Sequence, residues 1–247
     1  MSQRIIITGA SSGIGAALAH EYARRGFDMG LCARRSDALE QLCSQLSAQY
    51  PQQAFLWETL DVADLGQVAP VIQRLAERLG SVDIVIANAG ITGVRRTGSG
   101  DLSTDLAVLQ VNLLGAIATI DAATAIFRTQ GHGHLVGISS FSAFRGIPGS
   151  AAYSASKAAL TNYLQAVRTE LFRKNIQVTC IHPGFIKTDI SPGMEKFPFV
   201  IAADKAARNM ANAIQKKKQE KTVPGWPWAV LKHLMPLLPD SLIAKIF

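Results

Sequence analysis

A tyrosine and a lysine four residues apart, Tyr153 and Lys157, have the spacing of an acid/base pair in this 247-residue sequence. On a helix, residues i and i+4 lie on one face about one turn apart, so the lysine ammonium would lie near the phenol. A free tyrosine has a pKa of about 10, and a nearby positive charge favours its phenolate. The pair could therefore exchange a proton with a substrate at neutral pH, although this spacing also arises by chance.

Two upstream polar residues could complete such a site. Ser140 follows a predicted strand at Leu135–Ile138, and its hydroxyl could orient a carbonyl or alcohol oxygen. Asn112 lies inside a helical pattern that runs from Asp101 to about Thr129, where asparagine is a weak helix former. Its side chain could cap a local kink, or it could hold a water that relays protons to Lys157.

A glycine-rich turn near the start of the chain predicts a dinucleotide site. Arg4–Thr8 has the pattern of a buried parallel strand, and a helical pattern then continues to Arg25. The turn between them lets backbone amides and the helix N-terminus approach a pyrophosphate. Its candidate binding residues are Gly9, Ser11, Ser12, Gly13, Ile14 and Gly15. The spacing is Gly-x-x-x-Gly-x-Gly, and a turn without a ligand is the alternative.

The end of the second predicted strand, Asp28–Ala33, favours NADP(H), with NAD(H) as the second possibility. An NAD site of this kind places an acid near this point, whereas Arg34 and Arg35 stand here. A guanidinium suits the 2′-phosphate of NADP(H), and we expect Arg34 to be the main contact. The alternative is that Arg35 and Asp37 are only exposed residues at a helix start.

Strands and helices alternate along the chain. Further strands are predicted at Ala54–Thr59, Val82–Ala87 and Ile176–Ile181, with a helical pattern over Leu65–Leu79 and another that begins near Ala151. This alternation is typical of an α/β protein with a doubly wound parallel sheet and helices on both faces.

In sheets of this kind, ligands bind at the carboxyl ends of the strands. Asp61 and Val62 follow the third predicted strand, where the aspartate could accept a hydrogen bond from an adenine amino group or cap a helix. Asn88, Ala89 and Gly90 follow the fourth strand, and small residues there let a cofactor lie close to the backbone.

The composition is that of a globular protein, with 48% hydrophobic residues and a length that suits one large domain. Cys32, Cys43 and Cys180 are far apart, so neither a disulfide framework nor a zinc site is indicated. The net charge of +7 is spread along the chain, which does not indicate a nucleic-acid partner. The dense run Lys216–Lys218 with Lys221 is read as a solvated helix end, with anionic-lipid contact as the alternative.

Two later segments are expected to shape a substrate site. Residues 185–203 contain prolines and few helical signals, and we expect a flap in which Thr188 donates to a carboxamide. Residues 223–247 form an apolar tail that prolines and charges interrupt too often for a membrane span. The tail could close an apolar pocket, pack on a partner subunit or lie at a membrane interface, and we favour packing. The first apolar run enters a glycine turn rather than a cleavage site, so we expect a cytoplasmic protein.

In their order along the chain, these motifs resemble the short-chain dehydrogenase/reductase family, and the resemblance covers nearly the whole chain. The matching residues are Thr8-Gly9-x-x-x-Gly13-x-Gly15, Asp61, Asn88-Ala89-Gly90, Asn112, Ser140, Tyr153-x-x-x-Lys157, and Pro183-Gly184 with Thr188. Ala87 departs slightly, because many members have another asparagine there. The resemblance implies one Rossmann domain over residues 1–247 with about seven parallel strands, the last at Thr222 and Val223.

The resemblance also implies a chemistry for each catalytic position. Tyr153 would exchange a proton with the substrate oxygen, and Lys157 would lower the tyrosine pKa and bind the nicotinamide ribose. Ser140 would orient the reacting oxygen, and Asn112 would support the proton relay. Hydride would pass between the nicotinamide and the substrate carbon. The implied cofactor contacts include Tyr153, Lys157, Pro183, Gly184, Ile186 and Thr188.

From these observations we expect an NADP(H)-dependent oxidoreductase that acts on a carbonyl or secondary alcohol of a small apolar substrate. The resemblance implies a homodimer or homotetramer built on the two helices that contain Asn112 and Lys157. One alternative is an NAD-dependent alcohol dehydrogenase of the same family. Another is a non-catalytic protein that senses the dinucleotide and binds a partner through the tail. A further alternative is peripheral membrane contact through the tail.

Overall fold

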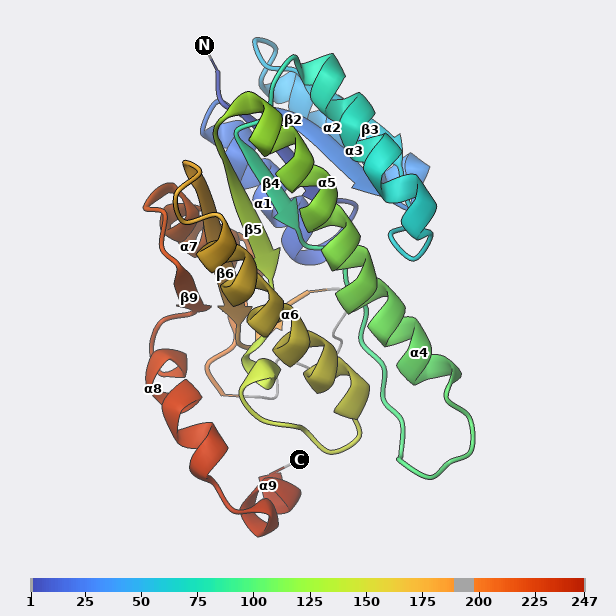
Figure 1. The fold of residues 1–247 in the computed structure, drawn as a ribbon, viewed down its shortest axis with the longest axis vertical. Helices are drawn as coiled ribbons and strands as arrows, with labels where there is room; N and C mark the ends of the chain where they lie inside the picture. Colours follow the sequence, from blue (N-terminus) through green and yellow to red (C-terminus); the bar gives the residue numbers. More distant parts are fainter. Residues whose placement is uncertain (1, 189–197, 247) are drawn as a thin grey trace.

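Seven parallel strands form the central sheet, in the order β3-β2-β1-β4-β5-β6-β9 (Figure 1). The computed structural model describes residues 2–188 and 198–246. The strands are β1 Arg4–Thr8, β2 Asp28–Ala33, β3 Phe55–Thr59, β4 Ile84–Ala87, β5 Gly133–Ile138, β6 Ile176–Pro183 and β9 Glu220–Val223. The strand order reverses between β1 and β4, which creates the switch point at which such sheets bind ligands. The predicted doubly wound α/β class is confirmed.

Helices cover both faces of the sheet (Figure 1). The helices around the sheet are α1 Gly13–Arg24, α2 Ser36–Gln49, α3 Leu65–Leu79, α4 Ser103–Leu109, α5 Gly115–Gln130, α6 Ala151–Glu170 and α7 Ala203–Gln215. Ile5 and Ile7 of β1 pack in the core with α1, α2 and α7, whereas Ile6 packs with α3, α5 and α6. Successive strand residues face opposite sides, so a strand buried on both faces is apolar throughout.

The long helix predicted from Asp101 to about Thr129 forms, but it is interrupted by the π-helical turn η1 Gln110–Leu114 between α4 and α5. Asn112 lies in that turn, and π turns inside α-helices are often found at functional sites. The stretch Ser103–Gln130 is apolar and long enough to cross a bilayer by length and composition. Half of its most apolar window is buried inside the protein, as in the core helix of a globular domain.

The expected flap and tail lie beyond β6. The predicted flap falls in part on residues 189–197, outside the described residues, and its ends pair as β7 Ile186–Lys187 and β8 Ile201–Ala202. The expected apolar tail contains α8 Trp228–Leu234, a 3₁₀ turn at Met235–Leu237 and α9 Asp240–Ile246 (Figure 1). The tail buries part of its apolar surface, because Trp228 packs with Phe141 and other residues near the end of β5.

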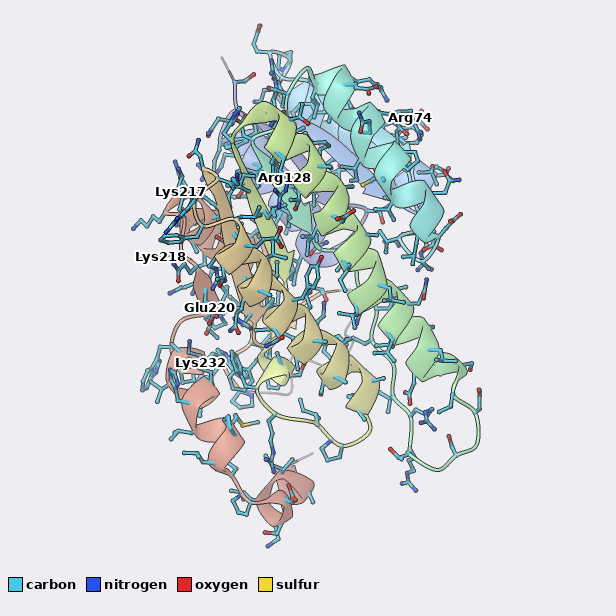
Figure 2. All side chains as sticks on the ribbon, in the orientation of Figure 1. Arg74, Arg128, Lys217, Lys218, Glu220 and Lys232 are labelled. Carbon is cyan, nitrogen blue, oxygen red and sulfur yellow. The ribbon has the colours of Figure 1, made fainter. Side chains whose placement is uncertain are left out.

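The lysines and cysteines take ordinary structural positions. Lys217 and Lys218 are exposed just after α7 and lie at the edge of the molecule (Figure 2). Cys32, Cys43 and Cys180 are buried and free. Burial raises the pKa of Cys43 to about 11, and of Cys32 and Cys180 to about 12. Thiols with such pKa values are poor nucleophiles at neutral pH.

Candidate active site

Tyr153 and Lys157 lie in the first two turns of α6, and the lysine Nζ is 5.9 Å from the centre of the tyrosine ring. Lys157 is only 4% exposed, and its Nζ donates a hydrogen bond of 2.9 Å to the carbonyl oxygen of Ile138. Burial lowers the pKa of Lys157 to about 8, because a desolvated ammonium is unfavourable. The structure therefore brings the two residues together as their spacing predicts.

Ser140 follows β5 in an extended conformation, and its hydroxyl lies near enough to the Tyr153 phenol to lower the pKa of that group. Its Oγ also accepts hydrogen bonds from the backbone amide of Ser142 at 3.1 Å and from the Ser142 hydroxyl at 2.9 Å. Burial raises the pKa of Tyr153, while the neighbouring Ser140 hydroxyl lowers it by less. The net shift is upward, opposite to the direction expected from Lys157, because desolvation of the phenol outweighs the other effects.

Asn112 is fully buried and braces the segment that follows β4. Its Nδ2 donates to the Ile91 carbonyl at 2.9 Å, and its Oδ1 accepts from the Ile91 amide at 2.8 Å. A Cβ on Gly90 would lie 3.2 Å from Asn112 Oδ1 and 3.6 Å from Lys157 Nζ. Close packing of Gly90 therefore brings Asn112 and Lys157 near each other, and the water relay stays a prediction.

The glycine turn is joined to the end of β4 by a network that centres on Thr8 and Asn88. The Asn88 side chain donates to the carbonyls of Thr8 and Gly9, at 2.9 and 3.2 Å. The Thr8 hydroxyl accepts from the backbone amides of Asn88 and Ala89, at 3.1 and 3.2 Å. These hydrogen bonds thus join the carboxyl ends of β1 and β4 at the switch point. The sequence predicted that Asn88 contacts the cofactor, whereas its side chain hydrogen-bonds the backbone of Thr8 and Gly9.

The turn itself fits a dinucleotide pyrophosphate. Gly9 has φ +69°, and a Cβ there would lie 2.7 Å from the Ala89 Cα. A Cβ on Gly15 would lie 2.2 Å from the Gly9 carbonyl oxygen. Ser12, at the N-cap of α1, makes no capping hydrogen bond, and the first turn has no acidic residue. The N-terminal amides of α1 are thus available to an anion.

Arg34 and Arg35 lie beside this turn, at the end of β2. The Arg35 guanidinium donates to the Ser11 hydroxyl at 3.1 Å and to the Ser11 carbonyl at 3.3 Å. Arg34 is exposed and makes no hydrogen bond or ion pair within the described parts of the chain. Arg35 is therefore more than an exposed residue at a helix start, and Arg34 is free to bind an anion.

Asp61 and Val62 occupy the carboxyl end of β3. The Asp61 Oδ1 accepts a hydrogen bond of 3.0 Å from the Ala63 amide, so this carboxylate closes its own turn. The N-cap of α3 is Asp64, and Asp61 does not cap that helix. Val62 is buried, and its carbonyl oxygen would be 2.7 Å from a Cβ on Gly115. The adenine contact of Asp61 and the cofactor contact of Val62 stay predictions.

Pro183 and Gly184 stand at the end of β6, next to a buried histidine that the sequence analysis missed. His182 is 1% exposed, its Nδ1 lies 3.4 Å from the Ser140 carbonyl oxygen, and burial lowers its pKa to about 4. Ile186 is buried in β7, and Thr188 is half-buried at the limit of the described segment. The position of His182 directly before Pro183-Gly184 was a signal that it lies at the same strand end.

Two serines next to the candidate catalytic residues were also missed. The Ser139 hydroxyl donates to the Lys157 carbonyl at 3.0 Å, which joins β5 to α6. The Ser156 hydroxyl donates to the Tyr153 carbonyl at 2.7 Å and is 3.4 Å from Asn112 Nδ2. Both are small polar residues adjacent to a predicted site residue, and they hold the backbone that carries it.

Comparison with known proteins agrees with this geometry. Residues 3–197 match the family described as short chain dehydrogenase. An uncharacterized oxidoreductase of Mycobacterium tuberculosis is 39% identical over 244 residues, which cover 98% of this chain and 96% of that protein. Levodione reductase has a TM-score of 0.85 at 25% identity, covering 92% of this chain and 98% of that chain.

An alcohol dehydrogenase from the archaeon Thermococcus sibiricus, complexed with 5-hydroxy-NADP, has a TM-score of 0.80 at 26% identity. That alignment covers 90% of this chain and 96% of the other. The resemblance drawn from the motifs is thus confirmed by family, sequence and fold. The chain therefore belongs to the short-chain dehydrogenase/reductase family of oxidoreductases.

Proposed function

We propose that this protein is an NADP(H)-dependent oxidoreductase that interconverts a carbonyl and a secondary alcohol on an apolar substrate. The observation that carries the proposal is the grouping of Tyr153 and Lys157, 5.9 Å apart on one face of α6, with the Ser140 hydroxyl near the phenol and Lys157 buried. These three groups lie at the carboxyl ends of the strands, where a doubly wound sheet binds its ligands.

Tyr153 acts as the acid in the reducing direction. Its raised pKa keeps the phenol protonated at neutral pH, so it can donate a proton to the carbonyl oxygen that Ser140 holds. Lys157, a cation below its pKa of about 8, stabilises the phenolate that remains. Oxidation uses the same atoms in reverse. A bound nicotinamide supplies or accepts the hydride at the substrate carbon.

The chain offers a contact for each part of the dinucleotide. The amides at the start of α1 would hold the pyrophosphate, and Asp61 and Val62 would meet the adenine. Lys157 would bind the nicotinamide ribose. The dinucleotide would lie against the backbone of Asn88, Ala89 and Gly90, and its nicotinamide side would contact Pro183, Gly184, Ile186 and Thr188.

Two arginines support NADP(H) over NAD(H). Arg34 is exposed and has no partner among the residues that the structure describes, and Arg35 reaches across to Ser11 of the glycine turn. Both cations therefore flank the place where the adenosine ribose would end, and guanidinium groups bind a phosphate well. The dehydrogenase of Thermococcus sibiricus was solved with an NADP derivative, which is consistent with this choice.

The test is oxidation of NADPH and of NADH, followed by absorbance, across a panel of ketones and aldehydes. We expect Tyr153→Phe to lose turnover by about 10²- to 10⁴-fold because the proton donor is gone. Tyr163→Phe, on the same helix, is the matched control and should stay active. A Tyr153→Phe enzyme as active as the wild type would refute the catalytic assignment. Dinucleotide binding without turnover on any carbonyl would instead favour a sensing protein.

We also propose a homodimer or homotetramer that forms through the helices that carry Asn112 and Lys157. Leu106 and Leu114 support it, because they are 61% and 41% exposed on the first of these helices. Light scattering of Leu106→Glu should show a smaller species than the wild type. Free thiols at all three cysteines suit a cytoplasmic location, which cell fractionation would test.

For the tail, we propose that it packs over the substrate end of the fold. Burial of Trp228, Met235 and Ile243 supports packing over membrane binding. Co-sedimentation with anionic vesicles that disappears on truncation after Thr222 would overturn this choice.

A further inference from the structure

Trp228 is buried in a tail that also carries large exposed apolar side chains. Its side chain is 4% exposed, whereas Trp226 is 77% exposed and Leu237 is 78% exposed. Trp228 belongs to a small apolar cluster that is separate from the two large cores of the sheet. The cluster, called here the tail cluster, comprises Phe141, Trp228, Met235 and Ile243, with Phe144, Phe185, Leu231 and Leu238 packed against it.

Three neighbours of Trp228 come from the two loops that form the candidate active site. The Phe141 ring lies 4.6 Å from the indole, centre to centre, at an interplanar angle of 72°. The Phe185 ring lies at 4.8 Å and 81°. A Cβ on Gly184 would lie 2.6 Å from the indole ring, so no other residue fits there while Trp228 is in place. Edge-to-face contacts of this kind favour one relative orientation of the rings.

The contact between Trp228 and Phe141 restrains the segment that follows Ser140. Phe141 begins the 3₁₀ turn Phe141–Ala143, and Ser142 within that turn makes both of the 2.9 and 3.1 Å hydrogen bonds to Ser140 Oγ. The turn also continues into Phe144, whose ring lies 4.7 Å from that of His182. A side chain that packs on Phe141 therefore restrains the turn that orients the Ser140 hydroxyl.

The contact between Trp228 and Gly184 lies at the nicotinamide side of the proposed cofactor site. The Gly184 amide donates a 2.8 Å hydrogen bond to the Val223 carbonyl, so this loop is held by the strand that precedes the tail. The tail makes a further contact near its end, where Arg145 forms an ion pair with Asp240 of α9. Trp228 thus sits between two loops whose relative position decides where substrate oxygen and nicotinamide meet.

We propose that Trp228 is a positioning residue, through which the C-terminal tail fixes Ser140 and Gly184 in their productive places. This inference rests on the proposed function and deepens it, because it makes the tail part of the catalytic apparatus. Trp228 contacts no reacting atom in this scheme. Its effect comes from geometry, and a displacement of about 1 Å can lower a catalytic rate by about 10²-fold.

The test compares Trp228→Ala with Trp226→Ala, two tail variants that remove the same side chain from a buried and an exposed site. We expect kcat to fall by about 10- to 100-fold in Trp228→Ala, with a smaller change in the KM of the carbonyl substrate. Trp226→Ala should keep the wild-type kcat. Trp228→Phe, which preserves an aromatic ring against Phe141, should recover most of the loss. If the kcat values of the two alanine variants agree within about twofold, the proposal is wrong.

A pH profile separates positioning from a loss of stability. The neighbouring Ser140 hydroxyl lowers the pKa of Tyr153, so a displaced Ser140 lets that pKa rise. The acidic limb of alcohol oxidation should therefore move to higher pH in Trp228→Ala, while Trp226→Ala keeps the wild-type limb. A variant that is merely less stable would lose active enzyme without moving the limb. Should Trp228→Ala fail to fold, Trp228→Leu takes its place with the same expectations.

NADPH titration by calorimetry makes the inference testable even if no carbonyl substrate is turned over. Wild-type inactivity across the panel would be a failure of the proposed function alone. In that case we still expect Trp228→Ala to bind NADPH several-fold more weakly than Trp226→Ala, because Gly184 loses its support. Equal dissociation constants for the two variants in an inactive protein would overturn the inference. If the wild-type protein is active, the kcat values of Trp228→Ala and Trp226→Ala decide whether the inference holds.

Discussion

The Nζ of Lys157 donates a hydrogen bond of 2.9 Å to the carbonyl oxygen of Ile138, the last residue of β5. This bond joins α6 to the strand that leads into Ser140, so the lysine is fixed relative to both Tyr153 and Ser140. An amine and an ammonium can both donate to a carbonyl, and the contact does not require the charge. Burial is therefore the main influence on the pKa of Lys157, which falls to about 8.

The first prediction concerns pH. Lys157 is charged below its pKa of about 8 and neutral above it, so kcat/KM for carbonyl reduction should fall as the pH rises through about 8. A pH profile of the free-enzyme parameter kcat/KM would show this limb, and Lys157→Met should abolish it. A limb near pH 10, the value for a solvated lysine of about 10.4, would contradict the assignment.

The same shift affects stability with a defined sign. Between pH 8 and about 10.4 the unfolded lysine binds a proton that the folded lysine has released. Stability rises with pH wherever the unfolded state binds more protons. The contribution of Lys157 to the free energy of unfolding should thus increase across this window, and urea unfolding of wild type and Lys157→Met at several pH values would measure it.

Gly15→Ala should weaken NADPH binding by about 100-fold, because the new Cβ would lie 2.2 Å from the Gly9 carbonyl oxygen and displace the turn. Gly66→Ala is the matched control. Gly66 also lies in the first turn of a helix, and its nearest neighbour, Asp64 Oδ1, would be 3.5 Å from the added Cβ. Calorimetric titration measures both variants, and equal NADPH affinities would refute the role of the turn.

Arg34→Asp should raise the dissociation constant for NADPH by about 10- to 100-fold, since a charge-assisted contact with the 2′-phosphate is lost. NADH lacks that phosphate, so its affinity should not fall. Arg173→Asp makes the same charge change at an exposed position that precedes β6, at the opposite end of the sheet, and serves as the control. If NADPH affinity is unchanged in Arg34→Asp, the assignment of Arg34 is wrong.

Asn112→Ala should lower the free energy of unfolding by about 2–4 kcal/mol, because the Ile91 amide and carbonyl would both lose their buried partner. Asn162→Ala, at an exposed position of α6, should change stability by less than about 0.5 kcal/mol. Urea unfolding measures both. A stable Asn112→Ala protein would mean that water replaces the side chain.

The sequence alone determined the class of fold and the local parts of the site. Parallel strands buried on both faces are continuous apolar runs, so β1 and β4 could be found without the structure. The glycine turn and the Tyr153–Lys157 pair are local as well, because a helix places residues i and i+4 together. These features depend on neighbours in the chain, and short-range patterns are what a sequence displays.

Only the tertiary structure decided which distant residues meet and how burial changes their chemistry. Arg35 reaches Ser11, Asn112 holds Ile91, and Trp228 packs on Gly184. The spacing of Tyr153 and Lys157 predicted a lowered phenol pKa, yet burial raises it. Desolvation depends on every element packed around a group, and the side chains that surround Tyr153 and Lys157 come from strands and loops far apart in the chain. That is why the positions of Tyr153 and Lys157 could be predicted and their pKa values could not.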